Sequence, residues 1–273
     1  MKRNNKQSFK KLTSRECEVI ISKISTNFNN YISLRNKNHF ITSISANLTS
    51  IISIVLIRSM LKDNQSMEVL YLPCNETPPQ DFDITISICE KLGIKMKTVP
   101  IKFLTSTAKN LILQTFGNEL ASATLENIKN ELRSVILTSR CQSNDQLIIN
   151  DIDKTDLFLG RLKSSQIQYE EINLLANLLK TELNDIALYI NTKNNNLIPE
   201  SLFYSENISF LNLQQSLKLK LSEIDYLIQN LDNKLEIEKA NIRLTTNEEE
   251  KKIIHILDNN EYKRLRFSPI MGL

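Results

Sequence analysis

The turn that follows the first apolar strand constrains this chain most. Residues 40–56 read FITSISANLTSIISIVL, which predicts a strand at Phe40–Ser45, a polar turn, and an apolar helix from Thr49 or Ser50 to about Leu61. This layout is typical of a phosphate-binding turn in an α/β nucleotide site. Such turns use glycine, because the backbone adopts positive φ and approaches phosphate oxygens closely. No glycine occurs here. The sequence therefore indicates either a much diverged enzyme or a former enzyme with another role.

Alternating strands and helices continue on both sides of this turn. An amphipathic helix is predicted at Thr13–Leu34, and further strands at Val69–Leu72 and Lys95–Ile101. A β–α–β–α–β order favours an α/β fold with a parallel sheet and right-handed crossovers.

The helix between the last two of these strands carries its own boundary signals. Thr77 suits the N-cap, Pro78 the first helical position and Gln80 the third, which together resemble a capping box. Gly93 is a favoured residue just after a helix C-terminus. We therefore expect this helix to run from Pro78 to Gly93.

The second half of the chain reads as mostly helical. A helix is predicted at Ser122–Arg140, a fourth strand at Gln146–Asn150 and a short helix at Lys154–Leu162. Three further helices are expected at Ile172–Ile190, Leu217–Leu231 and Thr246–Asn260.

Composition excludes several classes of function. The 273 residues carry a net charge of only +3, which is too weak to indicate a nucleic-acid partner. The apolar stretch Ile41–Leu61 is interrupted by serines, threonines, Asn47 and Arg58, so a membrane span is not expected. The basic start (MKRNNKQSFKK) lacks the apolar segment of a signal peptide. We expect residues 1–12 to form a flexible basic arm and residues 13–273 a single domain.

The four cysteines, at positions 17, 74, 89 and 141, have no CxxC spacing. A zinc site is therefore not expected, and free thiols in a reducing cytoplasm are the interpretation. Cys74 follows a strand without an adjacent base, so a structural thiol is favoured over a nucleophile.

Six segments occur in the order and spacing of motifs from one enzyme family. They are SANLTS (45–50) beside the family's SGGIDS, TPPQD with KLGI (77–81, 91–94) beside TPPED and KLGI, ELRSVIL (131–137) beside RxRMxxL, IINDIDKTDLFLG (148–160) beside GTGNKSELLLG, LLKT (178–181) beside LYKT, and EYKR (261–264) beside EHKR. From about residue 17 to the end, the chain resembles the ammonia-dependent NAD synthetases. The resemblance implies an adenine-nucleotide α-hydrolase-like fold with a helix-rich C-terminal half, and a homodimer.

The resemblance also implies a reaction and its residues. That family adenylates the carboxylate of deamido-NAD with ATP and Mg²⁺, releasing pyrophosphate, and ammonia then displaces AMP. The phosphate-loop positions implied are Ser45, Ala46, Asn47, Thr49 and Ser50. The implied phosphate and substrate contacts are Arg133, Lys154, Lys180, Lys263 and Arg264. Asp156 stands where the family has a glutamate metal ligand.

Several of these positions depart from the family pattern. Ala46 and Asn47 replace two glycines, and Thr49 replaces an aspartate that would serve the metal and pyrophosphate. Residues 165–167 (SQI) fall where the family has a pyridine-side aspartate, and residues 201–207 (SLFYSEN) do not reproduce its PSAxL loop. Losing one transition-state donor commonly costs roughly 3–4 kcal/mol. Combined losses would cut activity by several powers of ten.

The polar residues themselves leave alternatives open. Asp151, Asp153 and Asp156 could form a surviving or shifted metal site, or Asp153 could simply cap the next helix. Lys154 and Lys180 could equally face phosphate or solvent. Arg133, among apolar residues, is expected in an ion pair or at an interface.

Three functional hypotheses follow. The first is a catalytically impaired NAD synthetase paralogue kept for binding, regulation or assembly, with no required cofactor. The second is a working ammonia-dependent NAD synthetase that uses ATP and Mg²⁺, with Asp156, Lys154 and Lys180 organising the nucleotide. The third is an enzyme for another carboxylate, suggested by Gln166 and Ile167 on the pyridine side. In each case we expect a cytoplasmic homodimer that buries the apolar segments 132–137 and 174–183.

Overall fold

The structure is a computed structural model that describes residues 10–117, 119–161, 171–203, 208–237 and 248–260. Most of the predicted basic arm lies outside these residues. Lys263 and Arg264 also lie outside them, as do residues 165–167, so the expectations placed on them stay predictions.

Five parallel strands form one sheet in the order β3-β2-β1-β4-β5. The strands are β1 (His39–Ile44), β2 (Ser66–Tyr71), β3 (Met96–Thr98), β4 (Leu147–Asp153) and β5 (Glu171–Leu175). The chain adds strands outward from β1 to β3 and then crosses back to place β4 on the other side of β1. The predicted α/β class with a parallel sheet is confirmed. The carboxyl ends of β1 and β4 meet where the strand order reverses, which is where open α/β sheets bind ligands.

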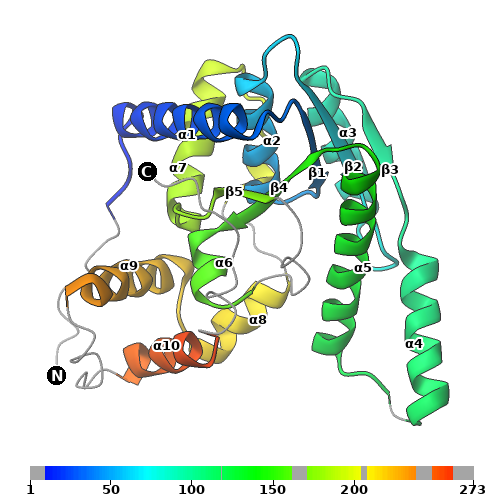
Figure 1. The fold of residues 1–273 in the computed structure, drawn as a ribbon. Coiled ribbons are helices and arrows are strands. Elements are labelled where there is room, and N and C mark those ends of the chain that lie inside the picture. The colour runs from blue at the N-terminus through cyan, green and yellow to red at the C-terminus, as the bar shows by residue number, and fades with distance from the viewer. Residues whose placement is uncertain (1–9, 118, 162–170, 204–207, 238–247, 261–273) are drawn as a thin grey trace.

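Helices cover both faces of the sheet (Figure 1). The cluster on one face is supplied mainly by α1 (Ser14–Arg35), α2 (Leu48–Met60) and α7 (Lys180–Lys193), with α3 (Pro79–Lys91) beside it. On the other face, α5 (Ser122–Ser143) packs against apolar side chains of β1, β2 and β4. Neighbouring β1 residues alternate between the two clusters, since Phe40 belongs to the first and Ile41 to the second.

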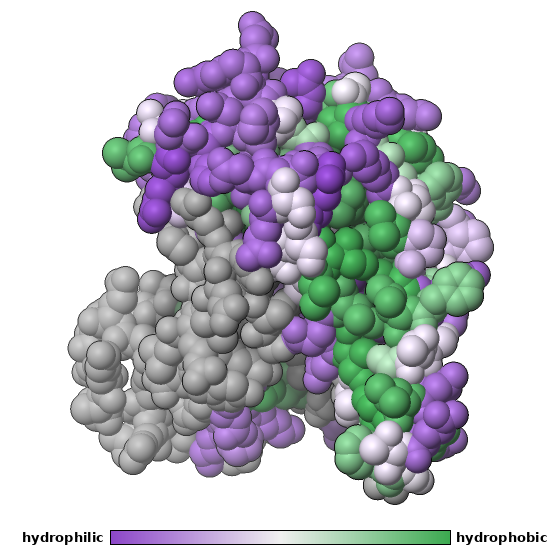
Figure 2. Space-filling view, turned by 45° about the vertical axis from the view of Figure 1, so that its right-hand side comes forward, coloured by the Kyte–Doolittle hydropathy of each residue, from purple (hydrophilic) through white to green (hydrophobic). Residues whose placement is uncertain are grey.

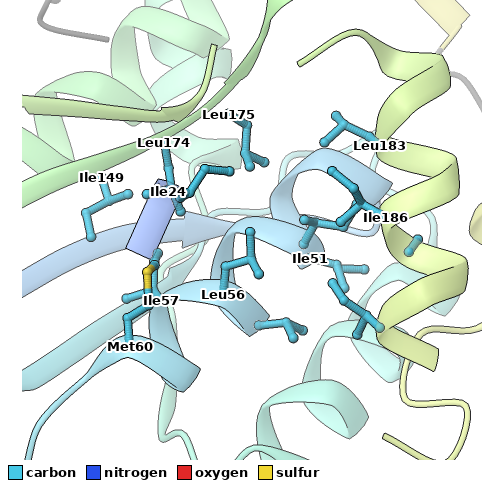
Figure 3. Packing of buried hydrophobic residues seen from close by; sticks show 14 of the residues in the cluster. Ile24, Ile51, Leu56, Ile57, Met60, Ile149, Leu174, Leu175, Leu183 and Ile186 are labelled. Carbon is cyan, nitrogen blue, oxygen red and sulfur yellow. The ribbon is translucent and has the colours of Figure 1, made fainter. Parts of the chain in front are cut away.

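The main cluster centres on α2, which is buried along most of its length. Figure 3 shows Ile51, Leu56 and Ile57 of α2 among side chains of α7 and β5, including Leu183 and Leu175. A helix that is apolar all round must be covered on all sides. The apolar sequence of α2 therefore reflects a central core helix, in keeping with the expectation that it does not span a membrane. Within the part of the chain that the structure describes, no helix is long and apolar enough to cross one.

The C-terminal helices form a second, smaller core. These are α8 (Ile208–Leu217), α9 (Leu221–Ile237) and α10 (Glu248–Asn259), preceded by the 3₁₀ turn Glu200–Leu202. Phe210, Ile224 and Ile253 are fully buried there, together with Leu159 and Leu179 from the region next to the sheet. Figure 1 shows these helices near α6 (Lys154–Phe158), which follows β4. This second core therefore lies close to the carboxyl end of β4.

Three elements differ from the sequence-based prediction. One is α8, because residues 208–217 form a helix where the prediction has none before Leu217. Residues 171–175 form strand β5 rather than the start of a helix at Ile172, and the helix begins at Lys180. A short continuous apolar run is ambiguous, because a strand buried on both faces has no period-two pattern. In addition, residues 102–116 form a helix, α4, which the sequence analysis did not predict. Its only buried residue is Thr105, so its apolar side chains do not follow a core-facing stripe.

The predicted capping box at Thr77 is wrong. Pro78 occupies the N-cap and Pro79 begins α3, with no side-chain cap hydrogen bond. The Thr77 hydroxyl instead accepts a hydrogen bond from the Cys74 amide at 2.9 Å, which fixes the preceding turn. At the other end the prediction holds, because Gly93 follows the helix with φ of +64°.

The Glu68 carboxylate ties β2 to β3 and α5. It accepts from Lys97 at 2.7 Å, Arg140 at 3.0 Å and Gln146 at 3.1 Å, and its side chain is 13% exposed. Partial burial alone would raise the pKa of Glu68, but these partners outweigh it and lower the pKa from 4.5 to about 2.

This lowered pKa predicts a pH dependence. A carboxyl whose folded pKa is depressed stabilises the fold above pH 4.5 and loses that contribution as the pH falls toward 2. We expect Glu68→Gln to lower the free energy of unfolding by about 1–2 kcal/mol at pH 7, because the charged partners are partly solvated. The difference should shrink at pH 3, as followed by urea denaturation at both pH values. A deficit that is equal at both would contradict this assignment.

Candidate functional site

The turn after β1 bonds several of its own backbone amides. Asn47 caps α2 with φ of −125°, and its Oδ1 accepts from the Ser50 amide at 2.8 Å. The Ser45 amide donates to Ser50 Oγ at 3.1 Å, and Asn47 Nδ2 donates to Ser45 Oγ at 2.6 Å. Neither Ala46 nor Asn47 has positive φ. A glycine-free sequence thus forms an ordinary side-chain N-cap, in which the Ser45, Asn47 and Ser50 amides are already bonded within the turn.

The end of β4 places a buried carboxylate against this turn. Asp153 is fully buried and caps α6, where its Oδ1 accepts from the Asp156 amide at 2.8 Å. Its Oδ2 accepts from Thr49 Oγ1 at 3.0 Å and from Lys180 Nζ at 2.7 Å. The capping interpretation of Asp153 is confirmed. This one carboxylate also joins the first turns of α2, α6 and α7, across the β1–β4 switch point.

Asp153, Asp156, Arg161 and Lys180 form what we term the carboxylate cluster. Asp156 pairs with Lys180 at 3.0 Å and with Arg161 at 2.8 Å. Lys180 therefore lies between the two carboxylates, and two acidic groups are matched by two basic ones. Lys180 is 12% exposed, so this neutralisation occurs mostly away from water.

The two acidic groups of this cluster titrate in opposite directions. Burial, followed by the nearby Asp156 charge, raises the pKa of Asp153. Burial would also raise the pKa of Asp156, but Lys180 and Arg161 outweigh it and the pKa is lowered. Asp156 is therefore the more firmly ionised of the two.

Two residues from the C-terminal helices complete this region. The buried Phe210 ring lies 5.5 Å from Lys180 Nζ and 5.3 Å from the Arg161 guanidinium carbon, as cation–π contacts. The buried Asp225 accepts from Thr155 Oγ1 at 2.6 Å and from the Thr181 amide at 2.8 Å. Asp225 thus supplies a carboxylate to the N-terminus of α7, a position that favours negative charge.

Sequence reasoning missed Arg161, Phe210 and Asp225. Only Asp225 carried a visible signal, because an acidic residue interrupts the apolar stripe that includes Ile224 and Ile228. A charged residue in such a stripe is rarely buried unless it is paired or hydrogen-bonded. The cation–π contacts of Phe210 with Lys180 and Arg161 join segments far apart in the chain, and no motif singled out the Arg161–Asp156 pair, whose residues are five positions apart.

Other predicted site residues lie in separate surroundings. Arg133 on α5 donates to the Leu72 carbonyl at 3.3 Å and to Asn130 Oδ1 at 3.1 Å, with Cys74 Sγ at 3.7 Å. These contacts lie just beyond the carboxyl end of β2. Lys154 Nζ lies 5.6 Å from the Phe158 ring centre. None of these three partners of Arg133 is a carboxylate, so the expected ion pair is not among these contacts.

A divalent metal does not fit this arrangement. Mg²⁺ is usually held by one or two carboxylates together with phosphate and water oxygens. Here one oxygen of Asp156 meets Arg161 and the other meets Lys180. Among the described residues there is no group of three or more His, Cys, Asp or Glu side chains arranged for a metal. Asp156 as a metal ligand therefore stays a prediction, and we derive no step through a metal.

The fold and the switch-point site define an adenine-nucleotide α-hydrolase-like α/β protein. Residues 20–266 match the sequence model of the NAD synthase family. The chain therefore belongs to the NAD synthase family.

Two relatives match at low sequence identity. The chain is 24% identical over 148 residues to the NH₃-dependent NAD⁺ synthetase of Saccharolobus solfataricus, which spans 53% of this chain and 50% of that one. This match covers only about half of the relative's length. The chain is also 20% identical over 208 residues to the NH₃-dependent NAD⁺ synthetase of Thermoplasma volcanium. That match covers 74% of this chain and 77% of the relative.

Solved structures confirm the fold. The NH₃-dependent NAD synthetase of Campylobacter jejuni superposes with a TM-score of 0.68 at 17% identity, covering 90% of this chain and 95% of that one. The NMN synthetase of Francisella tularensis superposes at 0.67 and 17%, covering 94% and 99%. At such identity these likenesses establish the architecture and not the activity.

Proposed function

We propose that this chain is an NAD synthetase-like protein with impaired adenylation chemistry, retained for a binding, regulatory or assembly role. The observation that carries the proposal is that the turn after β1 forms hydrogen bonds to its own amides. Asn47 Oδ1 accepts a hydrogen bond from the Ser50 amide, and Ser50 Oγ accepts one from the Ser45 amide. A triphosphate would have to displace these bonds before the Ser45 and Ser50 amides could donate to it.

The carboxylate cluster supports the same proposal. The ammonium of Lys180 is already bonded to Asp153 and Asp156, and Phe210 covers it. A phosphate that approached Lys180 would compete with two carboxylates and bring further negative charge beside them. Electrostatic stabilisation of the transition state is usually the largest catalytic contribution, so neutralising this lysine removes much of it.

An amidation assay tests the proposal directly. The protein would be incubated with ATP, Mg²⁺, ammonia and deamido-NAD, with the C. jejuni enzyme as a positive control. We expect turnover at least roughly three powers of ten below the control, because one lost donor alone costs 10²–10³. Calorimetric titration with ATP·Mg²⁺ and with deamido-NAD would show whether either ligand still binds. Turnover at ordinary enzyme rates would refute the proposal.

A drifted but active ammonia-dependent NAD synthetase is the alternative. The observation in its favour is that Lys180 and Asp156 remain adjacent at the switch point. ATP and Mg²⁺ would be required only on this alternative. It predicts that Asp156→Ala abolishes turnover, and an unchanged rate in that variant would count against it.

An altered carboxylate substrate is the third hypothesis. Its support is the similar architecture of the F. tularensis NMN synthetase, a structural neighbour whose name gives a different nucleotide product. Gln166 and Ile167, on which the hypothesis rests, lie outside the described residues. A panel of pyridine carboxylate nucleotides in the same assay distinguishes it, since only one of them should be amidated.

We also propose a homodimer in the cytoplasm. The earlier expectation that segment 174–183 would be buried by a dimer is wrong, because its leucines are buried within one protomer. A better candidate is the α4–α5 face, where Phe103 is 73%, Leu111 63%, Phe116 71% and Val135 56% exposed. Figure 2 shows a hydrophobic band along this side of the molecule. A second copy would cover apolar area that water otherwise contacts.

The cytoplasmic location rests on the cysteines. All four are free thiols, in keeping with a reducing compartment.

The dimer face predicts a change of assembly state. The double variant Phe103→Asp/Phe116→Asp should weaken dimerisation by at least roughly a hundredfold, because each charge would be desolvated in the interface. Analytical ultracentrifugation over a concentration series measures this. Leu34→Asp is the matched control, since Leu34 is 85% exposed on α1, which packs on the other face of the sheet. Equal dissociation constants for the two variants would contradict this assignment, as would a monomeric wild type.

A further inference from the structure

An open pocket of about 330 Å³ lies where the helices α1, α2 and α7 meet. The α1 residues between Glu18 and Thr26 form most of its wall, and the last turn of α2 and Tyr189 of α7 form the rest. Figure 1 shows these three helices together at one side of the sheet. Because α2 begins at the switch point and ends here, its 13 residues place the two regions roughly 18 Å apart. A pocket of this volume is large enough for a small organic molecule.

The charges around this pocket are negative. Its walls include the Glu18 carboxylate and no lysine or arginine side chain. No hydrogen bond or ion pair joins Glu18 to another described residue. The C-terminal end of α2 adds partial negative charge, because the last carbonyls of a helix have no intrahelical partner. Arg58, the basic residue of that last turn, donates to the Leu92 carbonyl at 3.1 Å and does not line the pocket. The pocket therefore favours a cation.

Two hydroxyls of the pocket are already used as donors. Thr26 Oγ1 donates to the Ser22 carbonyl at 3.0 Å, and Ser59 Oγ donates to the Leu56 carbonyl at 2.7 Å. A hydroxyl has one proton and two lone pairs, so both oxygens are left to a ligand as acceptors. A ligand that supplies several donors matches these oxygens and the Glu18 carboxylate.

Apolar and aromatic side chains form the remaining wall. Ile21 and Met60 line the pocket, and both also pack in the main hydrophobic cluster. The Tyr189 ring, which faces the same pocket, already has an ammonium beside it, because Lys193 Nζ lies 5.7 Å from the ring centre. Such a ring attracts cations, and the aliphatic side chains suit a short hydrocarbon chain.

We propose that this pocket binds a small organic ammonium ion, which is a primary amine on a short alkyl chain. Glu18 and the hydroxyl oxygens of Thr26 and Ser59 accept from the ammonium group, and Ile21 and Met60 contact the chain. A bare metal ion fits less well, because among the described residues no three acidic, His or Cys side chains are grouped for one. The site goes beyond the proposed function and does not depend on it. It also stays open in the proposed dimer, since α1 and α5 pack on opposite faces of the sheet.

Three probes with the same four-carbon chain test the chemistry: n-butylammonium, 1-butanol and butyrate. Each would be titrated into the full chain and followed by amide chemical shifts. We expect n-butylammonium to bind with a dissociation constant of roughly 1–10 mM, as befits a ligand of few atoms. The amides of residues 18–26, 59–60 and 189 should shift most. Butanol should bind at least roughly tenfold more weakly, because it has one donor and no charge, and butyrate should not bind.

Two variants separate the charge from the shape of the pocket. Glu18→Gln should weaken n-butylammonium binding roughly fivefold, the equivalent of one exposed charge pair. Glu90→Gln is the matched control and should leave binding unchanged, because Glu90 is an exposed residue of α3 outside the pocket. Ser22→Phe should abolish binding by filling the space while Glu18 remains. Ser22 is exposed on α1, and an unaltered thermal midpoint would show that this variant is folded.

Several results would overturn the proposal. Equal affinities for n-butylammonium and 1-butanol would contradict selection for a cation, as would unweakened binding in Glu18→Gln. Amide shifts spread over the whole surface, or none at 50-fold molar excess and beyond, would show that the pocket is not a binding site. None of these measurements involves ATP or turnover, so they leave the proposed function untouched, and a failed amidation assay leaves the ammonium site untouched.

Discussion

Replacing Lys180 with Met should lower the free energy of unfolding by about 3–5 kcal/mol, because it leaves Asp153 as a buried carboxylate without its cationic partner. Asp153 is 0% exposed and Lys180 Nζ lies 2.7 Å from it. Methionine keeps most of the aliphatic packing beneath Phe210, so the loss reports mainly on the charge. Urea denaturation at pH 7 measures it.

The matched control for this variant is Lys193→Met on the same helix. Lys193 is exposed at the last turn of α7, where its ammonium lies 5.7 Å from the Tyr189 ring centre. An exposed contact of this kind is worth at most about 1 kcal/mol. If Lys180→Met were no less stable than Lys193→Met, the description of the carboxylate cluster as a buried, neutralised group would be wrong.

Replacing Asp225 with Ala should cost about 2–4 kcal/mol. The change leaves the Thr155 hydroxyl and the Thr181 amide without their acceptor in a buried position, and each such group costs about 1–3 kcal/mol. Both are bonded to Asp225 in the structure. Asp225→Asn should have an intermediate effect, since its amide oxygen can still accept one of the two bonds.

Chemical denaturation and amide hydrogen exchange together check this prediction. The exchange rate of the Thr181 amide should rise in Asp225→Ala beyond the change expected from global stability alone. Ser222→Ala serves as the control, because Ser222 is an exposed residue of the same helix. Retained protection at Thr181 in Asp225→Ala would show that another group satisfies the α7 N-terminus.

The layered fold could be predicted from sequence because its signals are local. The alternation of apolar strands with helices around Ile44 and Ile54 predicts a parallel sheet, and Gly93 marks the end of α3 correctly. Strand β5 was not predicted because all five of its residues are buried, so its sequence does not alternate between apolar and polar residues as a half-exposed strand does. Helix α4 was not predicted because its apolar side chains face outward, whereas the prediction looks for an apolar stripe that faces the core.

The candidate site was predictable only in part. The absence of glycine between β1 and α2 correctly indicated an altered turn, but its replacement by a side-chain cap from Asn47 required the geometry. The pairing of Thr49 with Asp153 joins residues 104 positions apart, and the Asp225 contact to Thr155 joins residues 70 apart. Such long-range polar contacts depend on how the strands and helices are packed, and the one-dimensional pattern carries little of that information.

A crystal structure determined in the presence of ATP and Mg²⁺ tests the central claim most directly. Our account predicts that Asn47 Oδ1 stays on the Ser50 amide, that Lys180 stays on Asp153, and that no ordered triphosphate lies between them. Ordered triphosphate and magnesium at the β1–β4 switch point, with the main-chain amides of residues 46–50 directed at the phosphate oxygens, would contradict it.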